Sequence, residues 1–374
     1  MQALHYHRLF LPLAPLVAVV LLAGRAFPDT ITLADGKVLE NVTVVTEGLK
    51  ELTYKQDGKS KTVASDTVVA VEFKKKPKLV DQADTTAREG DIPGAIGIFE
   101  TYVGGLINGN GKESMQWALP YALQRLVDLN GSLGDGEAVL EAADLLIANG
   151  KDSRYLPGAY LSKATVLYDT KRQKEALAVI GELRKVIETQ TLGRRWELEA
   201  DLAAALSDPA LGAAKRRAKV IEISGAAGKD YPMVANRAKV AEGESYIEGE
   251  TKEFGKAMAV FQQIVGDPTS DAATLAGAYV GLGDCVFAKA IEMQKANKDA
   301  NPTFLEAVES YMRVVVLFPE QVRYRSKAMF LSGRALEFLG DDTSRGRARG
   351  LYRSVMREYK ESTWAEEARK QLGG

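Results

Sequence analysis

Side chains that could carry acid–base, nucleophilic or metal chemistry are scarce in this sequence. Its 374 residues include two histidines, His5 and His7, and one cysteine, Cys285. Hydrolases of the Ser-His-Asp and Cys-His types need an imidazole as general base, and most zinc sites draw on His or on several Cys. Neither set can be assembled beyond residue 7. Cys285 has no partner for a disulfide within the chain, and its apolar helical setting predicts a small core residue.

Carboxylates and glycines offer the remaining candidates for chemistry. The pairs at 341–342 and 366–367 are expected in a turn and on a helix surface, without an apolar run that would raise a pKa. The acidic positions 267, 271 and 284 lack the alternation of a calcium loop, and the glycines of 104–111 lack the Lys-Ser/Thr of a phosphate loop. The sequence therefore predicts no catalytic residue, no metal site and no cofactor.

The elements that would position any site are indicated by a repeated spacing near the C-terminus. Small, aromatic and aliphatic residues follow each other there at helical steps: Ala307, Tyr311, Val314 and Pro319, and then Gly333, Ala335, Ala348, Tyr352 and Val355. The first series predicts the second helix of a helix-turn-helix unit and the turn that ends it. The small residues at 333 and 335 predict a close approach of two helices in the next unit.

The same pattern recurs along most of the chain and resembles the tetratricopeptide repeat, a helix pair of 34 residues. Earlier units are Ala83, Ala95, Phe99 and Tyr102; Ala164, Leu167, Ala176, Ile180 and Leu183; Gly243, Tyr246, Ala257, Phe261, Ile264 and Pro268. The resemblance covers residues 79–372 and implies about seven helix pairs in a mainly α fold, an α-solenoid. The family pattern is broken between Gly283 and Ala307, where the step is 24 residues, so the first helix is extended or the turn carries an insertion around Lys295 to Pro302.

The resemblance also implies a binding surface. In this family the first helices line a concave groove that holds an extended peptide or another helix. Carried over by repeat position, the candidate groove residues are Arg237, Glu244, Asp284, Phe287, Lys327, Phe330 and Arg334. The Lys and Asn set that clamps a peptide carboxylate in some members is not apparent here. The expected partner is therefore a protein or peptide of unspecified sequence.

Residues 27–73 differ from the repeats. Short runs rich in Val and Thr are divided by Asp-Gly pairs at 35–36 and 57–58, which predicts about five antiparallel strands. The pattern resembles a small Sm-like or SH3-like barrel. Two roles stay open for this all-β, barrel-like domain: a cap on the open end of the first repeat, or a binding module.

Two basic segments have both a plain and a functional interpretation. Residues 74–78, Lys-Lys-Lys-Pro-Lys, form either a solvated stiff linker or a contact to an anionic membrane or polymer. Between residues 313 and 357 basic side chains outnumber acidic ones, and Arg349, Arg353 and Arg357 recur every four residues on one helix face. That face is either solvated or meets an acidic protein or an anionic envelope polymer.

The N-terminus has the layout of a secretory signal. Basic residues at 5–8 precede a fifteen-residue apolar run from Leu9 to Ala23, and small residues flank a cleavage position after Ala26. The run is short for a membrane span, although an uncleaved anchor or a buried helix is the alternative. Arg25 stands where a lipid-bearing Cys would be, so no lipid anchor is expected. Removal of residues 1–26 takes both histidines and leaves a net charge of −3, which gives no reason to expect nucleic acid.

These features together predict an exported, non-enzymatic scaffold in the periplasm or cell envelope. The last two repeats are similar to those of bacterial periplasmic repeat proteins, including the Tol-Pal-associated cell-division coordinator and the outer-membrane assembly lipoprotein. The resemblance implies a role in envelope assembly or maintenance. The alternative is an accessory protein that binds cell-wall glycan or anionic polymer through the β domain or the basic face. An enzyme is the third hypothesis, and the missing histidines argue against it.

Overall fold

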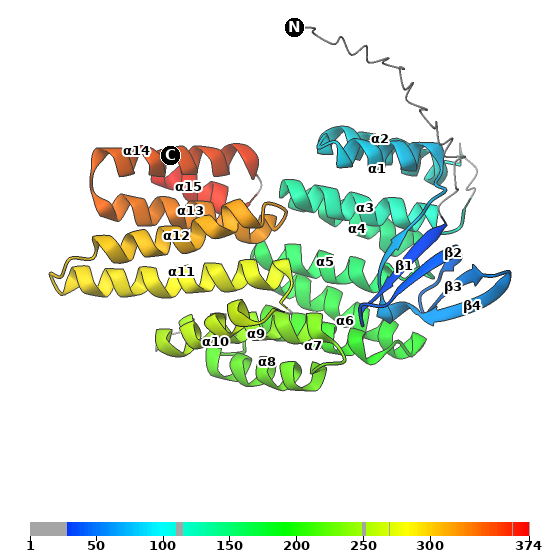
Figure 1. Ribbon diagram of the computed structural model, residues 1–374, viewed down its shortest axis with the longest axis horizontal. Helices are drawn as coiled ribbons and strands as arrows, with labels where there is room; N and C mark the ends of the chain where they lie inside the picture. The colour runs from blue at the N-terminus through cyan, green and yellow to red at the C-terminus, as the bar shows by residue number, and fades with distance from the viewer. Residues whose placement is uncertain (1–27, 110–114, 249–251, 269, 361, 374) are drawn as a thin grey trace, which may run out of the picture.

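The computed structural model describes residues 28–109, 115–248, 252–268, 270–360 and 362–373, and shows a small β-sheet followed by a helical solenoid (Figure 1). The signal segment expected at residues 1–26 lies outside the described residues. The last strand ends at Glu72 and the first helix begins at Lys78. The change of structure therefore coincides with the lysine-rich segment 74–78.

Five antiparallel strands form the sheet: β1 (Asp29–Leu33), β2 (Val38–Glu47), β3 (Glu51–Gln56), β4 (Lys59–Ala64) and β5 (Val68–Glu72). Their order is β4-β3-β2-β1-β5, so β4 and β5 are the two edges of an open sheet. The long strand β2 pairs with β1 through its first half and with β3 through its second half, and the sheet curls around it. The buried side chains of Ile31, Val42, Leu52 and Val68 fill the inside of the curl.

The Asp-Gly pairs fulfil their expected role as turns. Asp57 and Gly58 have φ of 52° and 74°, the left-handed values that a two-residue type I′ hairpin requires. The β3–β4 ladder then runs without a shift from Gln56↔Lys59 to Glu51↔Ala64. The expectation of about five strands divided by Asp-Gly turns is confirmed.

Fifteen helices follow within the described residues, and the first fourteen form seven hairpin pairs, as the repeat spacing predicts (Figure 1). Their bounds are α1 (Lys78–Arg88), α2 (Ile92–Ile107), α3 (Ala118–Leu133), α4 (Gly136–Asn149), α5 (Leu156–Asp169), α6 (Gln173–Gln190), α7 (Arg194–Ser207), α8 (Ala213–Ala227), α9 (Pro232–Ile247), α10 (Phe254–Gly266), α11 (Ala272–Lys295), α12 (Asn301–Leu317), α13 (Val322–Leu339), α14 (Asp342–Glu358) and α15 (Thr363–Gln371). Helix α15 packs against α13 and α14 and closes the C-terminal end.

Contacts between glycines and aromatic rings set the close packing within the C-terminal pairs. The ring of Phe261 on α10 lies directly over Gly243 of α9, where an added Cβ would be 2.4 Å from a ring carbon. Tyr352 of α14 lies in the same way over Gly333 of α13, where a Cβ would be 2.5 Å from the ring. Both rings are fully buried. A first helix that lacks a side chain at this position therefore admits the aromatic residue of the second helix.

Helix α11 accounts for the long step between Gly283 and Ala307. It runs for 24 residues, so the first helix is extended, as one of the two expected alternatives has it. The extension is held by an aromatic cluster in which Phe287 lies 5.7 Å from Phe304 and 5.5 Å from Phe338 between ring centroids. Among the described helices α11 alone is long and apolar enough to cross a membrane, but more than half of that stretch is buried inside the fold.

The β domain packs along the side of the solenoid. The aromatic ring of Phe73 stacks on Trp117, with 3.5 Å between centroids, at the start of α3. The carboxylate of Glu47 at the end of β2 accepts hydrogen bonds from Arg154 at 2.5 Å and from Tyr155 at 2.8 Å, just before α5. Contacts at the starts of α3 and α5 place the domain beside the helix ends, which differs from the cap over the first repeat that is one of the expected roles.

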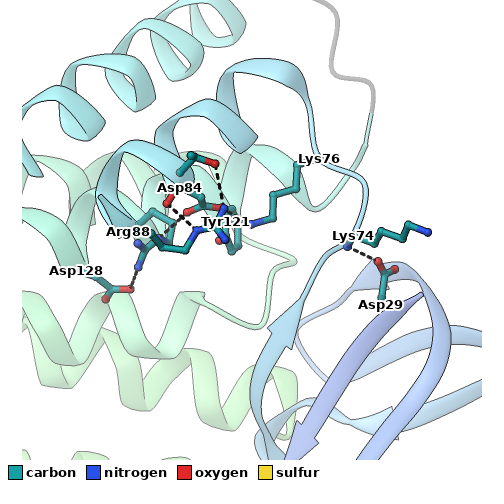
Figure 2. A network of polar contacts seen from close by, with 9 residues as sticks. Asp29, Lys74, Lys76, Asp84, Arg88, Tyr121 and Asp128 are labelled. Carbon is teal, nitrogen blue, oxygen red and sulfur yellow. Dashed lines mark hydrogen bonds and ion pairs between the residues drawn. The ribbon is translucent and has the colours of Figure 1, made fainter. Parts of the chain in front are cut away.

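One lysine of the segment 74–78, Lys76, is held by a buried carboxylate (Figure 2), whereas the other three lysines are exposed, as expected of a solvated linker. Asp84 of α1 is 5% exposed, so its charge requires compensation inside the protein. It pairs with the ammonium of Lys76, and it accepts hydrogen bonds from the Tyr121 hydroxyl at 2.7 Å and from Arg125 at 3.1 Å. The backbone amide of Lys74 donates to Asp29 at 2.8 Å (Figure 2). The segment therefore fixes the sheet to the first helix pairs.

Candidate binding cavity

The solenoid curls until its C-terminal pairs meet its N-terminal pairs. The guanidinium of Arg323, in the first turn of α13, forms an ion pair of 3.0 Å with Asp169 at the end of α5. Gly134, which follows α3 with a left-handed φ of 73°, lies next to Tyr359 and Val322, since an added Cβ there would be 3.5 Å and 3.6 Å from their side chains. Because α13 reaches both α3 and α5, the concave side of the solenoid becomes a partly enclosed space that stays open to solvent.

This space is a cavity of about 870 Å³. Its walls are mainly residues of α3, α5, α9, α11 and α13, which are first helices of their pairs, together with the starts of α4, α6 and α15. The arrangement follows from the repeat geometry, since the first helices of stacked pairs face the concave side. A volume of this size lies within the range of roughly 300–1,000 Å³ that ligand pockets occupy.

Positively and negatively charged side chains line the cavity wall. The ammonium of Lys327 on α13 lies 3.1 Å from Asp284 on α11, and the hydroxyl of Tyr311 donates to the other oxygen of that carboxylate at 2.8 Å. Burial disfavours the charged form of Lys327, but the carboxylates of Asp284 and Glu244 outweigh it and raise the lysine's pKa. The ammonium therefore stays protonated at neutral pH and holds α13 to α11.

Glu244 of α9 stands in this wall without such a partner. It is half-buried, and no hydrogen bond or ion pair of its carboxylate is found among the described residues. Burial raises its pKa, and the charges of Lys327 and Arg323 oppose that rise without cancelling it. Burial raises the pKa of the Tyr168 and Tyr324 phenols, and both lie near enough to Glu244 for its charge to raise their pKa further. Glu244 is thus an unsatisfied carboxylate between aromatic side chains.

The sequence-derived groove residues divide into two groups. Arg237, Glu244, Asp284 and Lys327 line the cavity together, from three different helices. The other three lie elsewhere: Phe287 is in the aromatic cluster of the α11 extension, Phe330 is 4% exposed in the core against Tyr352 and Trp364, and Arg334 is paired with Glu337. Phe330 therefore contributes to the interior and is unavailable to a ligand.

Repeat position alone did not indicate the residues that close the ring. Asp169 and Arg323 contact each other because the solenoid curls until α13 reaches α5, although these helices lie far apart in the sequence. The excess of basic residues between 313 and 357 was the available signal. The structure divides that stretch, since Arg323 and Lys327 face the cavity while Arg349 and Arg353 are exposed on α14. Whether the α14 face binds a partner stays a prediction.

Other candidate chemistry in the described residues is structural. Asp341 is an N-cap, and its carboxylate accepts the backbone amide of Ser344 at 2.9 Å. Cys285 is 1% exposed on α11, as expected of a core residue, and burial with the neighbouring Asp284 raises its pKa to about 12. Within the described part of the chain, no group of three or more His, Cys, Asp or Glu side chains is arranged to hold a metal ion.

Comparisons with known proteins do not identify a family for this chain. No family model matches the sequence, and no curated protein matches it. Among solved structures, the chain is similar to the TPR domain of P58(IPK), with 13% sequence identity and a TM-score of 0.27 over 79% of this chain and 96% of that one. At this TM-score the two structures superpose poorly, so the fold is defined by the seven helix pairs themselves.

Proposed function

We propose that this chain is an exported, non-enzymatic scaffold that holds a segment of a partner polypeptide in the cavity of its curled solenoid. The observation that carries the proposal is the cavity of about 870 Å³, which is lined by charged side chains from three first helices: Arg237 and Glu244 of α9, Asp284 of α11, and Arg323 and Lys327 of α13. Convergence of few polar groups in a preformed cavity is the usual form of a ligand site. The side chains there bind and orient, and none of them has the nucleophile–base geometry of a catalyst.

Export is proposed on the N-terminal sequence. The basic residues at 5–8, the apolar run from Leu9 to Ala23 and the small residues before position 27 support a cleaved leader. The similarity of the last two repeats to bacterial periplasmic repeat proteins supports a role in cell-envelope assembly or maintenance. The rigid attachment of the β domain through Glu47 and Asp84 supports a single binding body, in which the sheet braces the helix pairs.

A second candidate function rests on α14. Arg349 and Arg353 are exposed, and no ion pair of either is found among the described residues. Two uncompensated arginines one turn apart favour contact with an anionic envelope polymer. Reversal of both charges to glutamate would abolish sedimentation with purified cell-wall material at low salt, and unchanged sedimentation would remove this candidate.

A site-specific photo-crosslinker tests the cavity. Ser162 lies in the cavity wall on α5, and Gly350 is exposed on α14, where an added Cβ meets no atom within 4 Å, so the two positions form a matched pair. In the cell that makes the protein, the proposal expects a discrete polypeptide crosslinked from position 162 and absent from position 350. The same product from both positions, or none from position 162, would contradict it. A cleaved N-terminus on the purified protein, read by mass spectrometry, tests export separately.

A further inference from the structure

The charges around the cavity leave one carboxylate in excess. Six acidic and four basic side chains line it. Three of the bases are already engaged: Arg323 with Asp169, Lys327 with Asp284, and Arg237 with Glu199. The fourth, at position 171, is exposed at the rim.

The remaining acids are also committed, apart from Glu244. Glu248 pairs with Arg216, and Asp135 caps α4 by accepting the backbone amide of Ala138 at 3.0 Å. Asp128 accepts the Gln124 amide at 2.8 Å. Within the described residues Glu244 alone of the six therefore keeps its full hydrogen-bonding capacity for a guest.

The ionised carboxylate of Glu244 does not stabilise the fold. An ionised carboxylate that is half-buried without a partner costs free energy, and burial is the main cause of its raised pKa. Two tyrosines, Tyr168 and Tyr324, stand beside it in the wall. A carboxylate flanked by aromatic side chains is the combination that receives an ammonium or guanidinium group, through an ion pair and through contact with the ring faces.

On the proposed function, we infer that the cavity selects a polypeptide segment with a basic side chain, lysine or arginine, and that this side chain pairs with Glu244. The charged groups that act on Glu244 are Lys327, Arg323, Glu248 and Asp284, and each of them already has a partner of opposite charge. Lys327 and Arg323 of α13 are neutralised by Asp284 of α11 and Asp169 of α5, so they do not repel a guest cation as free charges would. Glu244 is therefore the charge of this cluster that lacks a partner among the described residues, and the guest supplies the positive charge that it lacks.

Fluorescent peptide pools test this inference on the full exported chain. Each pool is a short, otherwise uncharged random peptide with a fixed central Lys, Arg, Gln or Glu, and binding is measured by fluorescence polarisation. The Lys and Arg pools are expected to bind about tenfold more tightly than the Gln pool, as a charge-assisted hydrogen bond in a half-buried site implies. Glu244→Gln is expected to remove the preference. Glu141→Gln, which removes the same charge from an exposed position on α4, is the matched control and is expected to keep it.

A second variant is expected to bind more tightly, so misfolding of the variant could not produce the expected result. Lys327→Ala frees Asp284 and should strengthen binding of the Lys pool severalfold. Equal binding of all pools would overturn the inference and leave the proposed function standing. Tightest binding of the Glu pool, with that binding lost in Lys327→Ala, would do the same. Binding of no pool would overturn both. Spermidine is the control for a small amine ligand. If spermidine bound in a way that required Glu244 while no peptide pool bound, the ligand would not be a polypeptide.

Discussion

The contact between Gly333 and Tyr352 offers a sharp test of how the repeat spacing produces the fold. Gly333→Ala would place a Cβ 2.5 Å from Cε1 and 2.9 Å from Cζ of Tyr352. The ring is fully buried, so it cannot swing into solvent to relieve the overlap. Helices α13 and α14 must then separate or the ring must leave its rotamer, and either change in a packed core costs about 1–3 kcal/mol.

Gly350→Ala is the matched control in the same helix pair. Gly350 is exposed in the interior of α14, and an added Cβ there meets no atom within 4 Å. Both substitutions gain the same helix propensity, about 1 kcal/mol in favour of Ala. The difference in unfolding free energy between the two variants therefore isolates the overlap with Tyr352, and we expect Gly333→Ala to be less stable by about 1–3 kcal/mol.

Urea unfolding followed by circular dichroism measures the free energies, and hydrogen exchange of the α13 and α14 amides shows where stability is lost. Each pair contacts mainly its neighbours, so the faster exchange should concentrate in these helices. In a Tyr352→Ala background, Gly333→Ala should become stabilising, because the ring is gone. Equal stability of Gly333→Ala and Gly350→Ala would show that the ring yields freely and that glycine is not what sets the helix spacing.

Three further predictions concern ionisable side chains removed from solvent, two carboxylates and one thiol. Glu47→Ala should destabilise the β domain by about 3–5 kcal/mol, because Arg154 would stay buried without its partner, and urea unfolding with Glu47→Gln as the milder comparison measures this. Glu244→Gln should raise the unfolding free energy of the protein at pH 7 and leave it unchanged near pH 4. The reason is that the pKa of Glu244 is higher in the folded than in the unfolded protein, so its ionisation destabilises the fold as pH rises. Thermal melts of both proteins at both pH values measure this, and the same difference in melting temperature at pH 4 and pH 7 would refute it. Cys285, with its pKa raised to about 12, should resist Ellman's reagent at pH 8 in the native protein and react at once in urea, and rapid native reaction would contradict the placement of its thiol in the core.

The sequence predicted those parts of the fold that depend on local pattern. Small residues opposite aromatic ones, such as Gly333 and Tyr352, fix the pairing of adjacent helices, and Asp57-Gly58 fixes a hairpin. Both signals act between neighbours in the chain or within one repeat. Seven pairs and five strands could therefore be anticipated before the structure was known.

Closure of the solenoid could not be predicted in the same way. It depends on small rotations between successive pairs, which add up along the chain and bring Arg323 to Asp169. No single residue type announces such a sum. The repeat position placed Glu244 and Lys327 on the concave side, but it also placed Phe330 there, because position does not show which side chains the next helix covers.

The energetic cost of Glu244 connects the fold to the proposed activity. Buried charges elsewhere in this protein are compensated: Glu47 by Arg154, Asp84 by Lys76 and Arg125. These sites join the sheet and the first helix pairs, where a rigid frame is needed. In the cavity the same chain leaves one carboxylate uncompensated beside two neutralised pairs. A ligand with a basic side chain would remove that cost on binding. Its affinity would therefore include the free energy gained when the unpaired carboxylate of the empty protein acquires a partner.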